Sequence, residues 1–397
     1  MSRSTYQKGN SLQLRPRKQI ATTKCRICLC SKTHAFKIRS SLSNILADRS
    51  QGIAATKKIS MQKAQSFTGL PPIPPNLLAT ETRQFTDVSE MNELFKGRAD
   101  VRFIQKLPGG VSVKSRLTSI GTMRIQQLCW SGQLIVEAGT AKNQTALILP
   151  QPQRRPAIIS GEHLSDTQCI LYGPSTEHFT DLSDRGGGMQ LFFPNGMLEQ
   201  AIAARLQNDP MSLASKRKPL ELGRASMQCL RQLVVDLTQF ADDNASEGRE
   251  HLCQRTFNHQ TLMKTVVDHI SETLCRDQTL ASDALHPRVP PRCLLTRVRD
   301  IFDASGRKPI YLYELCQELG VSARTLQVTF KQAYGISPMR YLKLRRLHAV
   351  RERLFTTSVK EVSVKKAALE NVFFDRSRFA EDFKKLFGHL PSKTPRA

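Results

Sequence analysis

Apolar and polar residues follow different periods in successive parts of the chain. Between Val101 and Phe193, short apolar runs are separated by Gly, Pro, Asn and Asp, a pattern typical of strands in a sandwich or barrel. After Pro194 the apolar residues recur every three or four positions, which predicts helices. The fold class we expect is α+β and multidomain, with a β-barrel, then helices, then an all-α domain at the C-terminus.

The expected strands are Val101–Leu107, Val111–Thr118, Met123–Trp130, Gln133–Ala138, Ala146–Leu149, Ala157–Ile159, Cys169–Tyr172 and Met189–Phe193. The helices expected before the C-terminal domain are Asp87–Phe95, Met197–Arg205, Ala225–Phe240 and His251–Leu274.

The helix expected at Ala225–Phe240 has one apolar stripe, formed by Met227, Leu230, Leu233, Val234 and Leu237. A stripe of this kind fits either packing against the chain's own barrel or a dimer interface. We favour packing, because a single stripe is the ordinary property of a helix that covers a core.

The last third of the chain contains an internal repeat. The letters FKxxYGxxP begin at Phe330 and FKxxFGxxP begin at Phe383. Upstream of each copy lies a short apolar helical pattern followed by a turn, so each copy predicts helix, tight turn, helix. A second helix that is apolar on one side and basic or polar on the other is typical of a DNA-reading helix-turn-helix.

In the first module, Gly320 is expected to end one helix, since glycine tolerates a left-handed C-terminal cap. Ser322 is expected to cap the next helix through its hydroxyl. This reading helix spans about Ala323–Ala333 and buries Leu326 and Phe330 at positions i and i+4.

A connector helix and a second reading helix follow. Ser337 and Pro338 predict the start of the connector, which runs to about Leu354 with an apolar side and a basic side. His348 within it is expected to be a surface histidine. The second reading helix spans about Arg376–Phe387 and buries Phe379 and Phe383.

The predicted DNA contacts are the polar and basic residues on the outer faces of these three helices. They are Arg324, Gln327, Val328 and Lys331 in the first reader, Arg340, Lys343, Arg345 and Arg346 on the connector, and Arg376, Ser377 and Arg378 in the second reader. Arg324, Gln327, Arg376 and Ser377 are the four that we expect to reach base edges, because arginine and glutamine can pair bidentately with guanine and adenine. The connector residues are expected on phosphates.

Residues 294–391 resemble the DNA-binding domain of the AraC/XylS family of bacterial regulators. The stretches that carry the resemblance are ELCQELGVSARTLQVTFKQAYGISPMRYLKLRRL and AALENVFFDRSRFAEDFKKLFGHLP. Within the family, the first stretch is most similar to the ethanolamine-operon regulator group. The resemblance implies two homeodomain-like helix-turn-helix modules that read adjacent major-groove segments. It also implies a cupin-like β-barrel with helices for effector sensing or dimerisation, and activation of transcription.

One departure from the family pattern bears on stability. Val372 stands where the family usually has glycine in the second turn. If that position needs a positive φ angle, a β-branched side chain is strained there.

The expected domain limits and partners follow from this resemblance and the pattern. The expected regions are a leader and linker over 1–78, a sensor or dimerisation domain over 79–277, a linker over 278–291 and the DNA-binding domain over 292–397. The partner expected first is duplex DNA, bound in the major groove at a bipartite site. RNA polymerase, a small-molecule effector and a second copy of the chain are the further candidates, and no membrane partner is expected.

The distribution of charge supports a polyanion partner for the C-terminal domain. The net charge is +25, and residues 61–286 are neutral, with 23 basic and 23 acidic residues. Residues 287–397 carry 23 Lys and Arg against 10 acidic residues, and residues 1–60 carry 13 against one. A neutral region beside a basic one is typical of a sensor joined to a domain that binds nucleic acid.

Catalytic, metal and cofactor sites are not expected. The strand region holds only His163 and His178, without the HxH pair of a metal-binding cupin enzyme. Cys25, Cys28 and Cys30 leave open a second interpretation, a DNA-repair type regulator whose N-terminal segment binds metal. The glycine run after Asp184 lacks the Lys-Ser/Thr of a phosphate loop and is expected to form a hairpin turn.

The ten cysteines follow no disulfide framework, and no apolar run is long enough to span a membrane, so a bacterial cytoplasm with nucleoid association is expected. The basic leader over 1–60 has three interpretations: a disordered segment, an organellar transit peptide, or a start codon placed too far upstream of Met61. None of the three gives it a fold.

Overall fold

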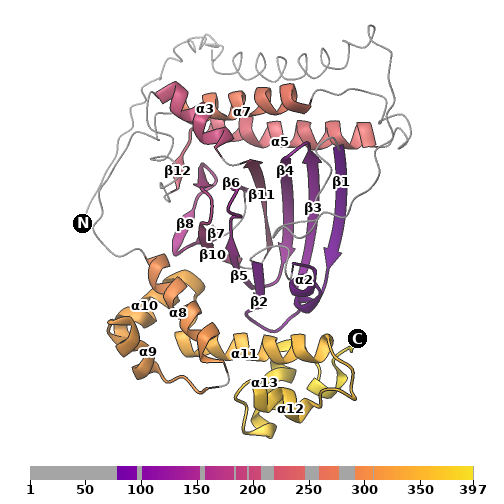
Figure 1. The fold of residues 1–397 in the computed structure, drawn as a ribbon, viewed down its shortest axis with the longest axis vertical. Helices are drawn as coiled ribbons and strands as arrows, with labels where there is room; N and C mark the ends of the chain where they lie inside the picture. The colour runs from indigo at the N-terminus through magenta and orange to yellow at the C-terminus, as the bar shows by residue number, and fades with distance from the viewer. Residues whose placement is uncertain are drawn as a thin grey trace, which may run out of the picture.

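The computed structural model describes residues 78–95, 101–152, 157–182, 185–194, 196–206, 219–245, 259–276, 291–306 and 308–396. They form a sheet-rich β-domain over residues 78–276 and a helical C-terminal domain over residues 291–396, which packs against the β-domain (Figure 1). The expectations for residues 1–77, including Cys25, Cys28 and Cys30, and for the linker residues 278–290 lie outside the described residues.

The β-domain contains two antiparallel sheets that face each other. One sheet has seven strands in the order β1-β3-β4-β11-β6-β9-β12, and the other has five in the order β2-β5-β10-β7-β8. The strands are β1 (Leu78–Phe85), β2 (Val101–Gln105), β3 (Ser112–Ile120), β4 (Met123–Ser131), β5 (Leu134–Gly139), β6 (Gln144–Pro150), β7 (Ala157–Ile159), β8 (Glu162–Leu164), β9 (Gln168–Tyr172), β10 (Glu177–Leu182), β11 (Arg185–Pro194) and β12 (Leu220–Glu221).

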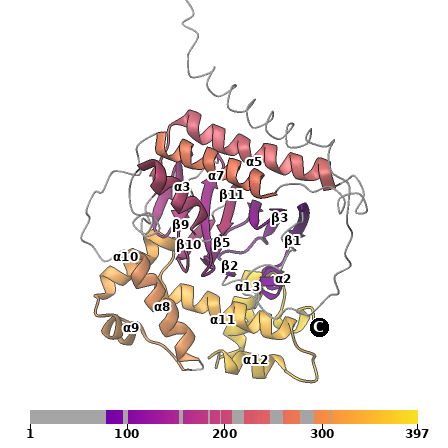
Figure 2. The ribbon, with the colours of Figure 1, turned by 45° about the horizontal axis from the view of Figure 1, so that its top comes forward.

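Three helices cover the outer face of the seven-stranded sheet. They are α3 (Met197–Leu206), α5 (Arg224–Ala245) and α7 (His259–Arg276), and Figure 2 shows α5 and α7 lying side by side. On β11, Met189, Leu191 and Phe193 are buried in one apolar cluster with these helices. The apolar stripe of α5 is buried in the same cluster, so the prediction that it packs on its own domain is confirmed.

A short helix, α2 (Val88–Phe95), packs on β2 and β1 at the end of the strands that is nearer to the C-terminal domain (Figure 1). Asn92 fixes it there, because its side-chain amide donates to the Phe103 carbonyl at 3.0 Å and its amide oxygen accepts from the Phe103 N–H at 2.8 Å. Its buried residues pack around Trp130 in a separate apolar cluster.

Two parts of the strand assignment differ from the expectation. Four strands, β1, β8, β10 and β12, were not predicted. β1 and β10 carry many Thr, Gln, Glu, His or Asp residues and lack an apolar run, and β8 and β12 are only three and two residues long. The glycine run was predicted as a hairpin turn, which is wrong for Arg185–Gly188, the first residues of β11. A Cβ atom at Gly187 would lie 2.2 Å from the Gln151 Oε1 atom, so glycine there permits close packing rather than a turn.

The C-terminal domain repeats a helix-turn-helix unit around a long central helix. Its helices are α8 (Pro291–Ser305), α9 (Leu312–Leu319), α10 (Ala323–Tyr334), α11 (Pro338–Phe355), α12 (Val364–Glu370) and α13 (Arg376–Phe387), followed by the 3₁₀ turn η2 (Pro391–Lys393). The first module is α9 with α10, the second is α12 with α13, and α11 connects them.

The two modules turn through the same left-handed backbone conformation with different residues. Gly320 has φ +66° and caps α9, as the sequence predicts. At the equivalent position of the second module, Val372 also has φ +66°. A β-branched residue pays a steric cost in this region that glycine avoids, so the predicted strain at Val372 is present.

Exchanging these residues should therefore change stability in opposite directions. We expect Val372→Gly to stabilise the chain by about 1 kcal/mol, because it relieves a left-handed valine. The mirror change Gly320→Val should destabilise by a similar amount, since nothing lies within 4 Å of the added Cβ and only backbone strain is introduced. Thermal unfolding of both variants tests this, and a lower midpoint for Val372→Gly would contradict it.

Candidate nucleic-acid interface

Side-chain caps set the start of both reading helices. The Ser322 hydroxyl accepts from the Thr325 N–H at 3.0 Å, as predicted, and the Asp375 carboxylate accepts from the Arg378 N–H at 3.0 Å. The Asp375 cap was not predicted, although an aspartate directly before the helix is a recognisable signal for it. Each cap therefore fixes the residue at which its reading helix begins.

The outer faces of both reading helices are exposed and basic. Seven of the predicted contact residues lie there with exposed side chains: Arg324, Gln327, Val328, Lys331, Arg376, Ser377 and Arg378. Within the described part of the chain, Arg324, Arg376 and Arg378 have no ion-pair partner. Lys331 donates to the Gly335 carbonyl at 3.1 Å. The opposite face of each helix is buried through phenylalanines of the module cores.

The connector helix α11 is more buried than its predicted form, because ten of its 18 residues are buried, Arg345, His348 and Arg351 among them. Arg340 is exposed, Lys343 pairs with Asp382 of α13 at 2.5 Å, and Arg346 is half-buried and donates to the Lys308 carbonyl at 3.1 Å. Burial lowers the pKa of Arg346.

Arg345 is a correction to the predicted DNA contacts. Its side chain is 8% exposed, pairs with Asp303 of α8 in its own domain at 2.7 Å and lies 3.9 Å from Glu137 of β5 in the β-domain. The prediction failed because the sequence does not show that the β-domain covers this face of α11.

His348 is a second correction, since it is buried rather than on the surface. It is 6% exposed, and its Nε2 atom donates to the Gln105 carbonyl of β2 at 3.1 Å. Its ring also packs edge-on against Phe387 of α13, with the centroids 5.0 Å apart.

Polar contacts join the β-domain to the C-terminal domain. Lys106 donates to both oxygens of Asp181, at 2.6 and 2.7 Å, and to the Tyr334 carbonyl at the end of α10, at 3.2 Å. The Tyr341 hydroxyl donates to Glu137, and the Gln105 amide donates to the Leu386 carbonyl of α13 at 3.1 Å. Both modules and the connector are therefore held by the β-domain.

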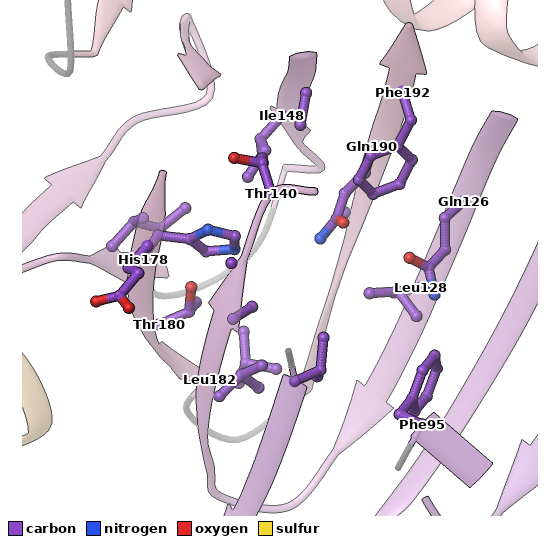
Figure 3. Close-up of a pocket in the computed structure, with 18 of the residues that line it drawn as sticks. Phe95, Gln126, Leu128, Thr140, Ile148, His178, Thr180, Leu182, Gln190 and Phe192 are labelled. Carbon is purple, nitrogen blue, oxygen red and sulfur yellow. The ribbon is translucent and has the colours of Figure 1, made fainter. Parts of the chain in front are cut away.

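A cavity of about 540 Å³ lies between the two sheets (Figure 3). Its wall is mostly apolar, with Gln126, Gln190, Thr180 and His178 among the polar side chains that Figure 3 shows around it. Arg124 also lines it, half-buried, and burial lowers the pKa of this guanidinium. A size of this order and a few convergent polar groups are usual for small-molecule sites.

Comparison with known proteins identifies the C-terminal domain. A family model described as a helix-turn-helix domain matches residues 315–397. The chain is 34% identical over 100 residues to XylDLEGF operon transcriptional activator 1 of Pseudomonas putida, which covers 25% of this chain and 30% of the relative. It is 33% identical over 94 residues to the "Probable thc operon regulatory protein" of Rhodococcus erythropolis, covering 24% and 28%. The C-terminal residues 315–397 therefore form a helix-turn-helix domain of AraC/XylS type.

The aligned segment spans less than a third of the length of these two relatives. Among solved structures, that of the AraC-like transcriptional activator CuxR matches with 11% identity and a TM-score of 0.35, over 74% of this chain and all of the other. The similarity to AraC/XylS-type regulators in sequence covers the C-terminal domain alone.

The sequence did not identify the residues that line the cavity or the β-domain residues that contact the AraC/XylS-type domain. Gln126, Gln190 and Thr180 lie on strands whose inner side can be recognised only once the two sheets are paired. The described residues contain no group of three or more His, Cys, Asp or Glu side chains arranged to hold a metal ion. Among the same residues, no helix combines the length and the apolar character that crossing a membrane requires.

Two buried groups between the β-domain and the AraC/XylS-type domain have pKa values shifted in opposite directions. Burial raises the pKa of Glu137 from 4.5 to about 7, against the lowering effects of the Tyr341 hydrogen bond and Arg102. Burial lowers the pKa of His348 from 6.5 to about 4, and the bond to the Gln105 carbonyl partly offsets this. Both shifts favour the neutral form, as expected between two packed domains.

These shifts predict opposing pH dependences that single variants should separate. A raised carboxyl pKa gives stability that is present at pH 4.5 and lost as the pH rises through 7. A lowered histidine pKa gives stability that is present above pH 6.5 and lost as the pH falls toward 4. We therefore expect His348→Gln to gain stability relative to the wild type as the pH falls from 7 to 5, by up to about 1.4 kcal/mol per pH unit. Glu137→Gln should lose stability over the same range.

The measurement is the thermal unfolding midpoint of each full-length variant between pH 5 and 8, expressed relative to the wild type. Parallel pH profiles for all three proteins would show that these groups are not buried between the domains.

Proposed function

We propose that the chain is a transcription regulator of AraC/XylS type that binds a bipartite site in duplex DNA through two helix-turn-helix modules. The observation that carries this proposal is the pair of capped reading helices with exposed basic faces, α10 with Arg324 and α13 with Arg376. Arginine on such a face can read guanine through two hydrogen bonds in the major groove. The relatives named as operon transcriptional activators favour activation over repression.

The β-domain is the sensor in this proposal. A cavity enclosed by two sheets, with a mostly apolar wall and a few polar groups, suits a small organic effector. An activator of this kind also contacts RNA polymerase and works where the nucleoid is, in the bacterial cytoplasm. A homodimer would need a surface other than the apolar stripe of α5, which is buried within its own domain. The proposal includes no catalytic role.

The domain limits belong to the same proposal. The β-domain and its helices act as the sensor over 79–277, and the DNA-binding domain begins near Pro291 with α8. The grouping with ethanolamine-operon regulators also stays a prediction.

The test of the proposed function is selection of bound sequences from random duplex DNA by the full chain at a stated salt concentration. Enrichment of two short blocks about one helical turn apart is expected for two working readers. Enrichment of a single block would restrict reading to one module. Tight, salt-sensitive binding without enrichment would overturn the proposal, because phosphate contacts alone produce that behaviour.

On the selected sequence, Arg324→Ala should reduce specific affinity by roughly 1–3 kcal/mol and relax the preference at one base pair. Arg340→Ala serves as a matched control, because an exposed connector arginine should weaken binding to all sequences alike. Titration of both variants with specific and random duplexes measures this. Equal losses on both duplexes for Arg324→Ala would remove it from the base-reading residues.

A further inference from the structure

The wall of the cavity changes from charged to aromatic along strand β4. The residues of β4 that line the cavity stand at every second position and are Arg124, Gln126, Leu128 and Trp130. Ile125 between them is buried against the helices on the other face of the sheet, as the pleat of a strand requires. One strand therefore presents a cation, an amide, an aliphatic group and an aromatic ring in this order, over about 20 Å.

Strand β11 pairs with β4 and matches this order. Gln190 lies directly opposite Gln126, and Gly188 lies directly opposite Leu128. The amides of the two glutamines thus share one level of the cavity, whereas glycine leaves space beside the leucine. Figure 3 shows Leu128 on the side of Gln126 that is nearer to Phe95, so the wall becomes apolar in that direction.

Arg124 is the cation at the polar end of this gradient. It is half-buried, and its side chain has no hydrogen-bond or ion-pair partner among the described residues. Burial lowers its pKa, but a guanidinium stays charged at neutral pH. Partial burial of a charge without a counter-ion costs free energy, and an anion beside Arg124 would recover part of this cost.

The other charged residues around the cavity leave this end positive. Lys142 is exposed and also lines the cavity, four positions before Ala146, which lies in the same row of paired strands as Arg124. The carboxylate of Glu177 pairs with Arg299 of α8 at 2.5 Å. An anion that enters the cavity is therefore attracted to the end where Arg124 lies.

The opposite end of the cavity is apolar and aromatic. Phe103, Val113 and Trp130 line it and are buried in one cluster, and Val136 of β5 packs on them. Such a surface suits a ring or a hydrocarbon chain. A molecule that satisfies both ends has to carry an anionic group and an apolar body.

We infer that the effector of the β-domain is an organic monocarboxylate: the Arg124 guanidinium binds its carboxylate, and its apolar body lies along β4 toward Trp130. The inference rests on the proposed function and names the chemical class of the effector. A guanidinium can bind a carboxylate through two parallel hydrogen bonds. A phosphate group carries up to two charges, and a single half-buried cation would leave the second charge beside an apolar wall.

The first test uses the fluorescence of Trp130. It is the single tryptophan of the chain and lines the cavity, so the tryptophan emission of the full-length protein reports on this site. The probes are 6-phenylhexanoate and the neutral amide 6-phenylhexanamide, which share one apolar body. We expect a saturable change with both probes and an affinity about tenfold or more higher for the acid, because only the acid forms a charge-assisted bond to Arg124.

The variant Arg124→Gln should lose this preference. Glutamine keeps a polar side chain on the same strand but carries no charge, so the acid should bind more weakly and the amide about as well as to the wild type. The matched control is Arg185→Gln, which removes the same charge from an exposed position of the same sheet. It should keep the preference of the wild type.

Thermal unfolding separates a binding role of Arg124 from a structural one. Without a probe, Arg124→Gln should unfold at the same temperature as the wild type or above it, because a half-buried charge without a counter-ion is removed. The acid should raise the midpoint of the wild type and of Arg185→Gln, and should raise that of Arg124→Gln much less. A lower midpoint for Arg124→Gln without a probe would instead show that the arginine supports the fold.

Three results of the titrations would overturn the inference. The first is equal affinity of the wild type for acid and amide, and the second is a preference for the acid that survives in Arg124→Gln. The third is tighter binding of 6-phenylhexyl phosphate than of the acid, which would assign the site to phosphorylated molecules.

Failure of the proposed function gives a different pattern, because the titrations contain no DNA. If the acid binds through Arg124 but the chain enriches no DNA sequence, the regulator is rejected and a carboxylate site remains. If DNA enrichment succeeds but the acid has no advantage over the amide, only the class of effector is rejected.

Discussion

Because successive side chains of a strand point to opposite faces, the five-stranded sheet has to satisfy two environments with one set of strands. Its inner face needs small and apolar residues around a cavity, and its outer face needs residues that match a folded domain. A shift of register by one residue would exchange Ile135 and Glu137 with Val136 and Ala138 and destroy both surfaces. The seven-stranded sheet meets the same constraint, with its outer face covered by helices of its own domain.

The connector helix α11 is the counterpart of this sheet. It supplies Leu344, Leu347 and Leu354 to the core of the DNA-binding domain and Tyr341 and His348 to the contact with the β-domain. The neutral forms of Glu137 and His348 are favoured there because neither charge can be hydrated. Apolar packing of Ile104, Ile135 and Phe179 against the helical core accompanies these polar contacts.

Local features of the C-terminal domain could be predicted from sequence, whereas its contact with the β-domain could not. Gly320, Ser322 and the left-handed Val372 depend on residues within a few positions, and the repeat showed where to look for them. The burial of Arg345 and His348 depends on strands more than 200 positions away in the chain. Strand β10 was missed for a related reason: its polar residues face a cavity or a partner domain, so they give no apolar run.

The outward residues of the five-stranded sheet and the residues of α11 that face it have to match each other. A different DNA-binding domain joined to this β-domain would have to supply partners for Asp87, Lys106 and Glu137, which contact Arg351, the Tyr334 carbonyl and Tyr341 here. Substitutions on β5 or β10 that reshape the cavity would in turn alter the surface on which the DNA-binding domain packs. Exchange of the DNA-binding domain is therefore limited by the need for matching surfaces on the five-stranded sheet and on α11.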